Sequence, residues 1–243
     1  KILWLFIFFP LFSLAQISDD FADGNFSSNP VWTGDTADFK ISIYSSSSWS
    51  QQPRLQLDGT IVDISHARIA APLASLNNVE WNFWTRPAFG TSSSNNARVY
   101  LVSDSDNLEG SLNGYFVMFG DDSNDALDSI SLCKQSGTTI TKLIHGHYTK
   151  TGASRNYRVK VTRDNAGLWE LAVDTAGMTN YLVEGTATDV SFNTSAFFGV
   201  FCRYTLTNKT GFYFDDIYVG PLVVDTVAPT LVSLNCLSAN ELD

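Results

Sequence analysis

Cysteine and basic residues are both scarce in this chain, and each shortage excludes a class of function. The three cysteines, Cys133, Cys202 and Cys236, lack the Cys-x-x-Cys spacing of zinc sites and redox motifs. Lysine and arginine number 15 against 25 aspartates and glutamates, which gives a net charge of −10. Because contacts to phosphate groups need clustered lysine and arginine, we expect no nucleic-acid partner.

The cysteines also bear on the redox state of the protein. Cys133 and Cys202 both lie in strand-like segments, so they could be buried thiols or a disulfide across the fold. We favour buried thiols, because exported domains that depend on disulfides usually contain more cysteines than this one. The state of Cys236 is left open.

Long apolar runs are missing except at the start of the chain. Lys1 precedes an apolar run from Ile2 to Phe12, and the small-residue ending Ser13-Leu14-Ala15 follows. This arrangement is typical of a secretory signal peptide, here residues 1–15, cleaved before Gln16. The run is shorter than the roughly 20 apolar residues that span a bilayer, so we do not expect the mature protein to span a membrane. We expect it to be secreted or displayed at the cell surface.

Helical periodicity is nearly absent, and alternation of apolar and polar residues takes its place. Clear examples are Phe39–Ile43, Val159–Val161 and Trp169–Val173, and such alternation indicates half-buried strands. Turn signals separate the strands. The best is Asn165-Ala166-Gly167, because asparagine and glycine accept the positive φ of a tight turn. About a dozen such strands predict one all-β domain over residues 16–220, an antiparallel β-sandwich or jelly roll.

The two ends of this domain share an aromatic and acidic character. Asp19–Phe26 opens it and Gly211–Gly220 closes it, and each reads as an aromatic-rich strand flanked by carboxylates. We expect these two strands to lie side by side. Residues 221–243 read as a linker and the first strand of an immunoglobulin-like domain that the chain does not complete.

Pairing of the two ends would bring several aspartates together. Asp20, Asp23, Asp215 and Asp216 would then form a cluster of hard oxygen ligands, with Asp19 beside them, and such ligands suit Ca²⁺. The alternative is a set of solvated acidic loops in which aspartates cap turns through their own backbone. A structural calcium ion is the cofactor that the sequence suggests.

The sequence contains no convincing catalytic constellation. A Gly-x-Ser-x-Gly nucleophile motif is absent. Sandwich-fold glycosidases use two carboxylates on one face, and the nearest match, Glu80-Trp81-Asn82-Phe83-Trp84, holds a single carboxylate. One carboxylate cannot serve as both acid and nucleophile, so we expect no enzyme activity from these residues.

Tryptophan offers the best candidates for contact with a ligand. Trp81 and Trp84 have opposite parity in one strand, so one of them should point outward, and Trp84 shares a face with Glu80 and Asn82. Trp49 lies in the serine-rich loop 45–50. We take Trp49, Trp84, Glu80 and Asn82 as candidate ligand-binding residues. The alternative is that the tryptophans are core residues, since aromatic side chains anchor sandwich packing.

Several segments resemble one family of exported bacterial proteins: Asp19-Asp20-Phe21, Asn29–Asp35, Ala97–Asp104, Leu112–Phe116, Phe198–Tyr204 and Phe214-Asp215-Asp216. Over residues 16–220 the chain is similar to the N-terminal domain of large exported proteins of Bacteroidota. Those proteins carry lamin-tail and immunoglobulin-like domains and a sorting domain for type IX secretion. The resemblance implies a concanavalin-like or laminin-G-like sandwich and an extracellular location, and it implies no catalytic residues.

These observations favour a non-catalytic extracellular binding module of a secreted multidomain protein. Its partner would be a polysaccharide or a cell-surface molecule. Two alternatives stay open. One is a structural or adhesion spacer without a ligand, and the other is an accessory domain of an enzyme whose catalytic domain lies beyond residue 243.

Overall fold

The computed structural model describes residues 17–43, 52–60, 63–74, 76–120, 129–152 and 154–222. The expected signal peptide, the expected immunoglobulin-like strand, Trp49 and Cys236 all lie outside these residues. Within the described ranges, no helix is long and apolar enough to cross a membrane.

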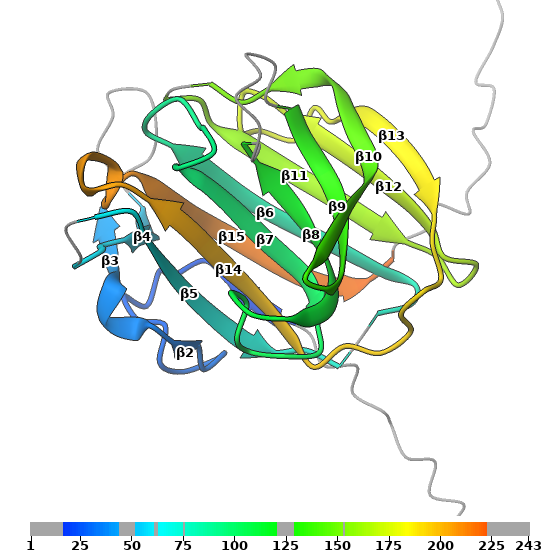
Figure 1. Ribbon diagram of the computed structural model, residues 1–243, viewed down its shortest axis with the longest axis horizontal. Coiled ribbons are helices and arrows are strands. Elements are labelled where there is room, and N and C mark those ends of the chain that lie inside the picture. Colours follow the sequence, from blue (N-terminus) through cyan, green and yellow to red (C-terminus); the bar gives the residue numbers. More distant parts are fainter. Residues whose placement is uncertain are drawn as a thin grey trace, which may run out of the picture.

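Two antiparallel β-sheets pack face to face as a sandwich (Figure 1). Sheet A has the order β13-β12-β11-β6-β15-β4-β3, and the short strand β1 pairs with β15. Its strands are β1 (Ile17–Asp19), β3 (Phe39–Ile43), β4 (Pro53–Leu57), β6 (Val79–Pro87), β11 (Tyr157–Arg163), β12 (Leu168–Asp174), β13 (Leu182–Thr188) and β15 (Phe212–Pro221).

Sheet B has the order β10-β9-β8-β7-β14-β5-β2. Its strands are β2 (Thr33–Gly34), β5 (Ser65–Pro72), β7 (Asn96–Ser103), β8 (Leu112–Phe119), β9 (Ser129–Gly137), β10 (Thr139–Lys150) and β14 (Phe197–Tyr204). Two short 3₁₀ turns, η1 (Thr36–Asp38) and η2 (Leu206–Asn208), complete the described elements. The expected all-β antiparallel sandwich of jelly-roll type is confirmed.

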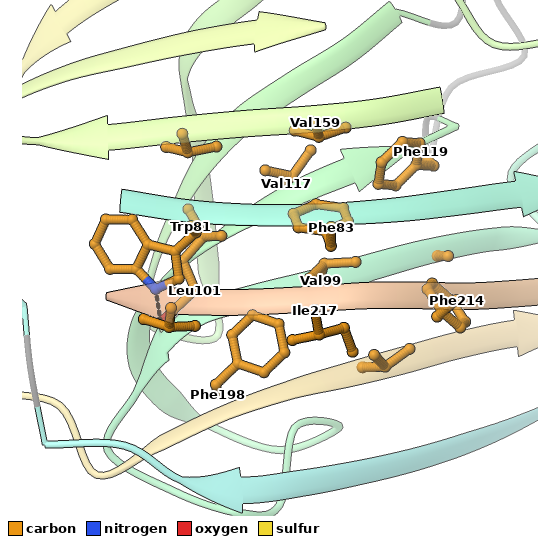
Figure 2. Packing of buried hydrophobic residues seen from close by; sticks show 14 of the residues in the cluster. Trp81, Phe83, Val99, Leu101, Val117, Phe119, Val159, Phe198, Phe214 and Ile217 are labelled. Atoms are coloured by element: carbon orange, nitrogen blue, oxygen red, sulfur yellow. Dashed lines mark hydrogen bonds between the residues drawn. The ribbon is translucent and has the colours of Figure 1, made fainter. Parts of the chain in front are cut away.

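The core lies between the sheets and follows from the alternation in the sequence. In β6 the side chains of Trp81 and Phe83 enter the core, and Trp81 stacks on Trp169 of β12 with ring centroids 5.5 Å apart. The Trp81 indole N–H donates to the Leu101 carbonyl oxygen of sheet B over 3.0 Å, so this ring joins the two sheets (Figure 2). Because side chains alternate across a strand, the residues of β6 that alternate with Trp81 and Phe83 point to the outer face of sheet A, the face turned away from sheet B.

A smaller apolar cluster covers the outer face of sheet B. Cys133 belongs to this cluster, and Cys202 belongs to the core between the sheets. The two cysteines therefore lie on opposite faces of sheet B, and both are buried thiols. The expectation of buried thiols is confirmed for these two cysteines, and burial raises the pKa of the Cys202 thiol.

The hairpin between β11 and β12 forms at the predicted turn. Arg163 pairs with Trp169, and Gly167 has a φ of +78°. A Cβ atom at Gly167 would lie 2.9 Å from the carbonyl oxygen of Asp189 and 2.4 Å from Val190 Cγ1. Both the backbone conformation and the close approach require glycine here.

Replacing Gly167 with alanine is expected to lower the free energy of unfolding by about 1–3 kcal/mol, because it combines a strained φ with a clash against backbone. Gly24→Ala is the matched control. Gly24 has a similar φ of +76° with nothing within 4 Å of a Cβ atom, so only the strain contributes. Urea unfolding of both variants measures the difference, and equal losses would show that the contact at Asp189 is unimportant.

The two ends of the domain meet, but not over the full segments that the sequence suggested. Ile17 pairs with Val219 and Asp19 with Ile217, so β1 runs antiparallel to β15. The predicted strand over Asp19–Phe26 is wrong, because β1 ends at Asp19 and turns follow. Aspartate carboxylates accept hydrogen bonds from backbone N–H groups two residues further on, as Asp19 does from Phe21 and Asp20 does from Ala22. Such local bonds compete with strand pairing.

Candidate ligand-binding site on sheet A

Three of the candidate ligand residues lie together on the outer face of sheet A. Glu80, Asn82 and Trp84 alternate in β6 with the core residues Trp81 and Phe83. The alternation of side chains along the strand therefore predicted correctly that these three residues share one face. The fourth candidate, Trp49, lies outside the described residues.

Trp84 does not project into solvent as the sequence suggested. It is 2% exposed, and the Arg54 guanidinium of β4 lies 4.1 Å from its ring centroid. Asp215 of β15 and Arg158 of β11 are its partners on the two neighbouring strands. The prediction of an exposed Trp84 is wrong, because the Arg54 side chain reaches over its ring from β4, on the far side of β15. Trp84 supports Arg54 and offers no open ring for a ligand.

Glu80 and Asn82 belong to a connected group of polar side chains. The Asn82 amide donates to Glu80 Oε1, and Lys160 Nζ lies 2.8 Å from Glu80 Oε2. The Tyr181 hydroxyl donates to Asn82 Oδ1 over 3.0 Å. Burial raises the pKa of Tyr181, so its hydroxyl keeps its proton and remains a donor. We call Glu80, Asn82, Lys160 and Tyr181 the Asn82 group.

A β-bulge in β15 brings both Asp215 and Asp216 to the outer face. The pairing with β6 shifts register between Asp215 and Tyr218, and Asp216 has a φ of +49°. Without the bulge, two consecutive residues would point to opposite faces. Aspartate is one of the few non-glycine residues that tolerates this left-handed conformation.

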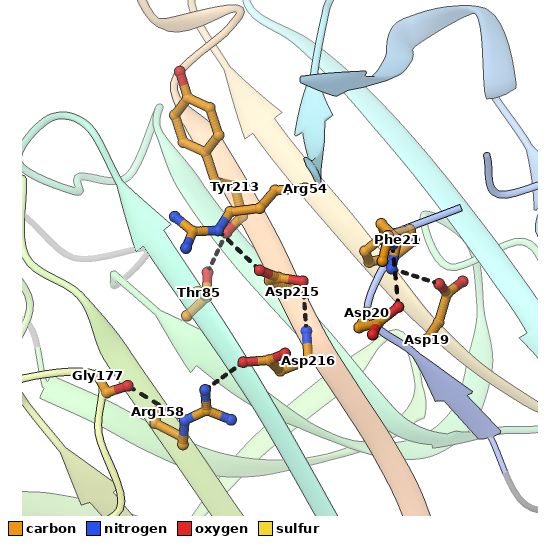
Figure 3. A network of polar contacts seen from close by, with 11 residues as sticks. Asp19, Asp20, Phe21, Arg54, Thr85, Arg158, Gly177, Tyr213, Asp215 and Asp216 are labelled. Carbon is orange, nitrogen blue, oxygen red and sulfur yellow. Dashed lines mark hydrogen bonds and ion pairs between the residues drawn. The ribbon is translucent and has the colours of Figure 1, made fainter. Parts of the chain in front are cut away.

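The two aspartates have different partners (Figure 3). Asp215 is 4% exposed and its Oδ2 lies 2.8 Å from Arg54 Nε. Burial, together with the neighbouring Asp216 charge, raises its pKa to about 6 in spite of the opposing effect of Arg54. Asp216 instead forms an ion pair with Arg158, whose side chain reaches across β6.

A pocket of about 290 Å³ lies where β1 meets β15. We call it the terminal-strand pocket; it is lined by Ser18, Asp19, Asp20, Arg158, Asp216, Ile217 and Tyr218. Tyr218 also pairs with Asn82 of β6. The pocket and the Asn82 group are thus neighbouring parts of one polar and aromatic surface.

Of the four aspartates predicted to bind Ca²⁺, only Asp20 and Asp216 line this pocket. Asp215 is engaged by Arg54, and both oxygens of Asp23 accept hydrogen bonds from Asn25. Among the described residues, no three His, Cys, Asp or Glu side chains are grouped to hold a metal ion. Ca²⁺ takes 6–8 oxygen ligands in general. The described side chains do not fit that ion, and calcium binding by the chain stays a prediction.

Sequence reasoning missed several members of this surface. Arg158 and Lys160 alternate with the core residues of β11, so parity alone could have placed them on the outer face. Ser18, Tyr181 and Tyr218 gave no such signal, because their place on this surface depends on the order of the strands in the sheet.

No protein-family model and no curated protein matches this sequence. Among solved structures, the exoplasmic/lumenal domain of VIP36 in its Ca²⁺/Man-bound form has a TM-score of 0.58 at 12% identity, over 92% of this chain and 98% of that one. The carbohydrate recognition domain of Emp47p has a TM-score of 0.56 at 13% identity, over 87% of this chain and 96% of that one. The legume lectin-like domain from Entamoeba histolytica has a TM-score of 0.51 at 8% identity, over 76% and 91%. The chain therefore has the legume-lectin-like, concanavalin-type β-sandwich fold.

Proposed function

We propose that this chain is a non-catalytic carbohydrate-binding module of an exported protein, and that the outer face of sheet A holds the glycan. The observation that carries the proposal is the joining of the terminal-strand pocket to the Asn82 group across Tyr218. The fold is shared with domains described as carbohydrate recognition domains, one of which is that of Emp47p. This likeness supports the class of ligand but does not locate the site.

The chemistry of the Asn82 group suits sugar hydroxyls. A hydroxyl both donates and accepts hydrogen bonds, and carboxylate, amide and ammonium groups provide both kinds of partner. Glu80, Asn82, Lys160 and Tyr181 already restrain one another through hydrogen bonds and an ion pair. Because these side chains are ordered in advance, binding costs less conformational entropy than it would with free side chains.

The exported location is part of the same proposal. It depends on the signal peptide at residues 1–15 and on the resemblance of residues 16–220 to exported Bacteroidota proteins with lamin-tail and immunoglobulin-like domains and type IX secretion. A glycan-binding domain at the start of such a protein would hold the following domains on a polysaccharide or at a cell surface.

A glycan array followed by calorimetry, with and without Ca²⁺, tests the proposal. We expect binding to at least one polysaccharide, and we expect Asn82→Ala to weaken it about tenfold, since the lost hydrogen bonds are each worth ~0.5–1.5 kcal/mol. Thr141→Ala, an exposed change on β10 of the other sheet, is the control and should bind as the wild type does. The absence of binding to any glycan under either condition would contradict the proposal.

A structural spacer without a ligand is the second candidate function. Trp32, Trp81, Trp84 and Trp169 are all between 0 and 3% exposed, so the tryptophans in the described part of the chain serve packing. This burial is what a spacer predicts. A negative glycan array, with an intact fold, would favour this second candidate.

A further inference from the structure

The terminal-strand pocket has the size of a site for one small ring. Its volume of about 290 Å³ is at the lower limit of the ~300–1,000 Å³ of typical small-molecule sites. Ser18 of β1 and Asp20 form one wall, and Asp216 and Tyr218 of β15 form the floor. Arg158 lies on the other side of Asp216 from Asp20 (Figure 3). A sugar ring in the pocket would have β1 on one side and Tyr218, beside Asn82, on the other.

The position of Asp20 in the pocket wall is fixed by its neighbours Asp19 and Phe21, which contact the core. Phe21 follows Asp20 with a φ of +52°, and its ring is fully buried next to Trp32, with ring centroids 6.2 Å apart. Asp19 accepts hydrogen bonds from the Phe21 backbone N–H over 2.9 Å and from the Trp32 indole N–H over 2.8 Å. Left-handed conformations at non-glycine residues persist where surrounding contacts enforce them, and they cluster at functional sites. Here Phe21 and Asp216 (φ +49°) both adopt one beside the pocket.

Several polar atoms of the pocket have no partner among the described residues. Both oxygens of Asp19 accept hydrogen bonds. Within the described part of the chain, Asp20 accepts a hydrogen bond only at Oδ1, and Asp216 only at Oδ2. Arg158 donates from Nε to the Gly177 carbonyl oxygen over 3.3 Å and from Nη2 to Asp216, which fixes the plane of its guanidinium. The second oxygens of Asp20 and Asp216 and the Nη1 of Arg158 are therefore ready for a ligand.

The charge of the pocket selects among sugars. Three carboxylates line it against one guanidinium, and that guanidinium already pairs with Asp216. A uronate or a sulfated sugar would bring a further negative charge close to Asp20 and Asp216, which is unfavourable. A neutral sugar avoids this repulsion, since its adjacent hydroxyls can donate to a carboxylate and accept from Arg158.

We propose that the terminal-strand pocket seats one neutral sugar ring at the end of a glycan, with the next ring over Tyr218 toward the Asn82 group. This inference rests on the proposed carbohydrate binding and adds to it the ligand class and the end-on mode. Asp20, Asp216 and Arg158 hold the hydroxyls of the terminal ring. The β1 wall limits the pocket to one ring, so the terminal ring of the glycan determines the affinity of the protein for it.

Filling the pocket tests this inference. Ser18 is an exposed residue on its wall, opposite Tyr218 in the β1–β15 register, so Ser18→Trp occupies the space without disturbing the core. Calorimetry would use tetrasaccharides of β-1,4-glucan, β-1,3-glucan and α-mannan, with tetragalacturonate as the anionic probe. For the neutral probe that binds, we expect Ser18→Trp to weaken binding at least tenfold. Thr141→Trp, which places the same ring on an exposed residue of sheet B, should leave binding within twofold. An octasaccharide of the same linkage should bind no tighter than the tetrasaccharide.

The outcomes separate the two proposals. Unchanged binding by Ser18→Trp, tighter binding of tetragalacturonate, or a strong gain from tetrasaccharide to octasaccharide would each overturn the pocket assignment while carbohydrate binding stands. If the wild type binds none of the four probes and no glycan on the array, the proposed function fails and the pocket assignment fails with it. Equal melting temperatures of wild type and Ser18→Trp are needed to show that the variant is folded.

Discussion

Replacing Arg54 with methionine is expected to lower the free energy of unfolding by about 3–5 kcal/mol at pH 8, because the change leaves a buried carboxylate without its partner. Arg54 and Asp215 are 4% exposed each, and the Nε to Oδ2 distance is 2.8 Å. Methionine keeps much of the side-chain volume over the Trp84 ring, so the lost charge dominates the effect. Chemical unfolding at several pH values measures it.

The stability lost in Arg54→Met should depend on pH, and the direction of this dependence follows from the pKa of Asp215. Burial raises the pKa of Asp215 from 3.8 to about 6 in the folded protein. A carboxyl group whose pKa is higher in the folded than in the unfolded protein stabilises the fold at pH values below its unfolded-state pKa. This contribution of about 3 kcal/mol is lost as the pH rises from ~4 through ~6. Removing Arg54 raises the pKa of Asp215 further. The variant should therefore lose less stability at pH 5, where the carboxyl group takes up a proton, than at pH 8.

The ion pair between Lys40 and Asp58 provides the matched control. Its side chains are 44% and 40% exposed, and exposed pairs contribute only ~0–1 kcal/mol. Lys40→Met should therefore have a small effect that changes little between pH 5 and pH 8. An Arg54→Met variant as stable as Lys40→Met at pH 8 would show that the buried pair contributes nothing.

Replacing Trp81 with alanine is expected to cost about 3–5 kcal/mol of unfolding free energy, the usual range for removing a buried tryptophan. Trp81 is fully buried, stacks on Trp169 and donates to the Leu101 carbonyl oxygen of the opposite sheet. The variant therefore loses packing, a ring contact and a hydrogen bond that joins the sheets. Domains are stable by only ~5–15 kcal/mol in total, so this loss is a large fraction.

Two further variants keep the Trp81 prediction interpretable. Trp81→Phe retains a ring and should cost clearly less than Trp81→Ala, so it provides a measurement if the alanine variant does not fold. Leu168→Ala changes a side chain that is 45% exposed in the same sheet and should cost less than ~0.5 kcal/mol. Equal losses for Trp81→Ala and Leu168→Ala would contradict the role assigned to Trp81.

The fold class could be predicted because the side-chain period of a strand appears directly in the sequence. Trp169, Leu171 and Val173 alternate with more polar residues, and all three are buried in the core. The limits of the first strand could not be predicted, because Asp19 and Asp20 bond to nearby backbone and end β1 early. Such local hydrogen bonds leave no mark on hydrophobic periodicity.

The candidate site could be predicted in part, and for a similar reason. Parity within β6 is enough to place Glu80, Asn82 and Trp84 on one face. The cover of Trp84 by Arg54 could not be foreseen, since β4 and β6 are brought together only by β15 between them. The bulge that turns Asp215 and Asp216 to the same face is equally a property of strand pairing.

The claim that the outer face of sheet A binds a glycan is tested most directly by nuclear magnetic resonance of the labelled protein during titration with the tetrasaccharide that binds. We expect the largest shifts at backbone amides next to the terminal-strand pocket and the Asn82 group, with Ser18, Asn82 and Tyr218 foremost. Shifts confined to the outer face of sheet B, around His66 and Phe201, would contradict the account.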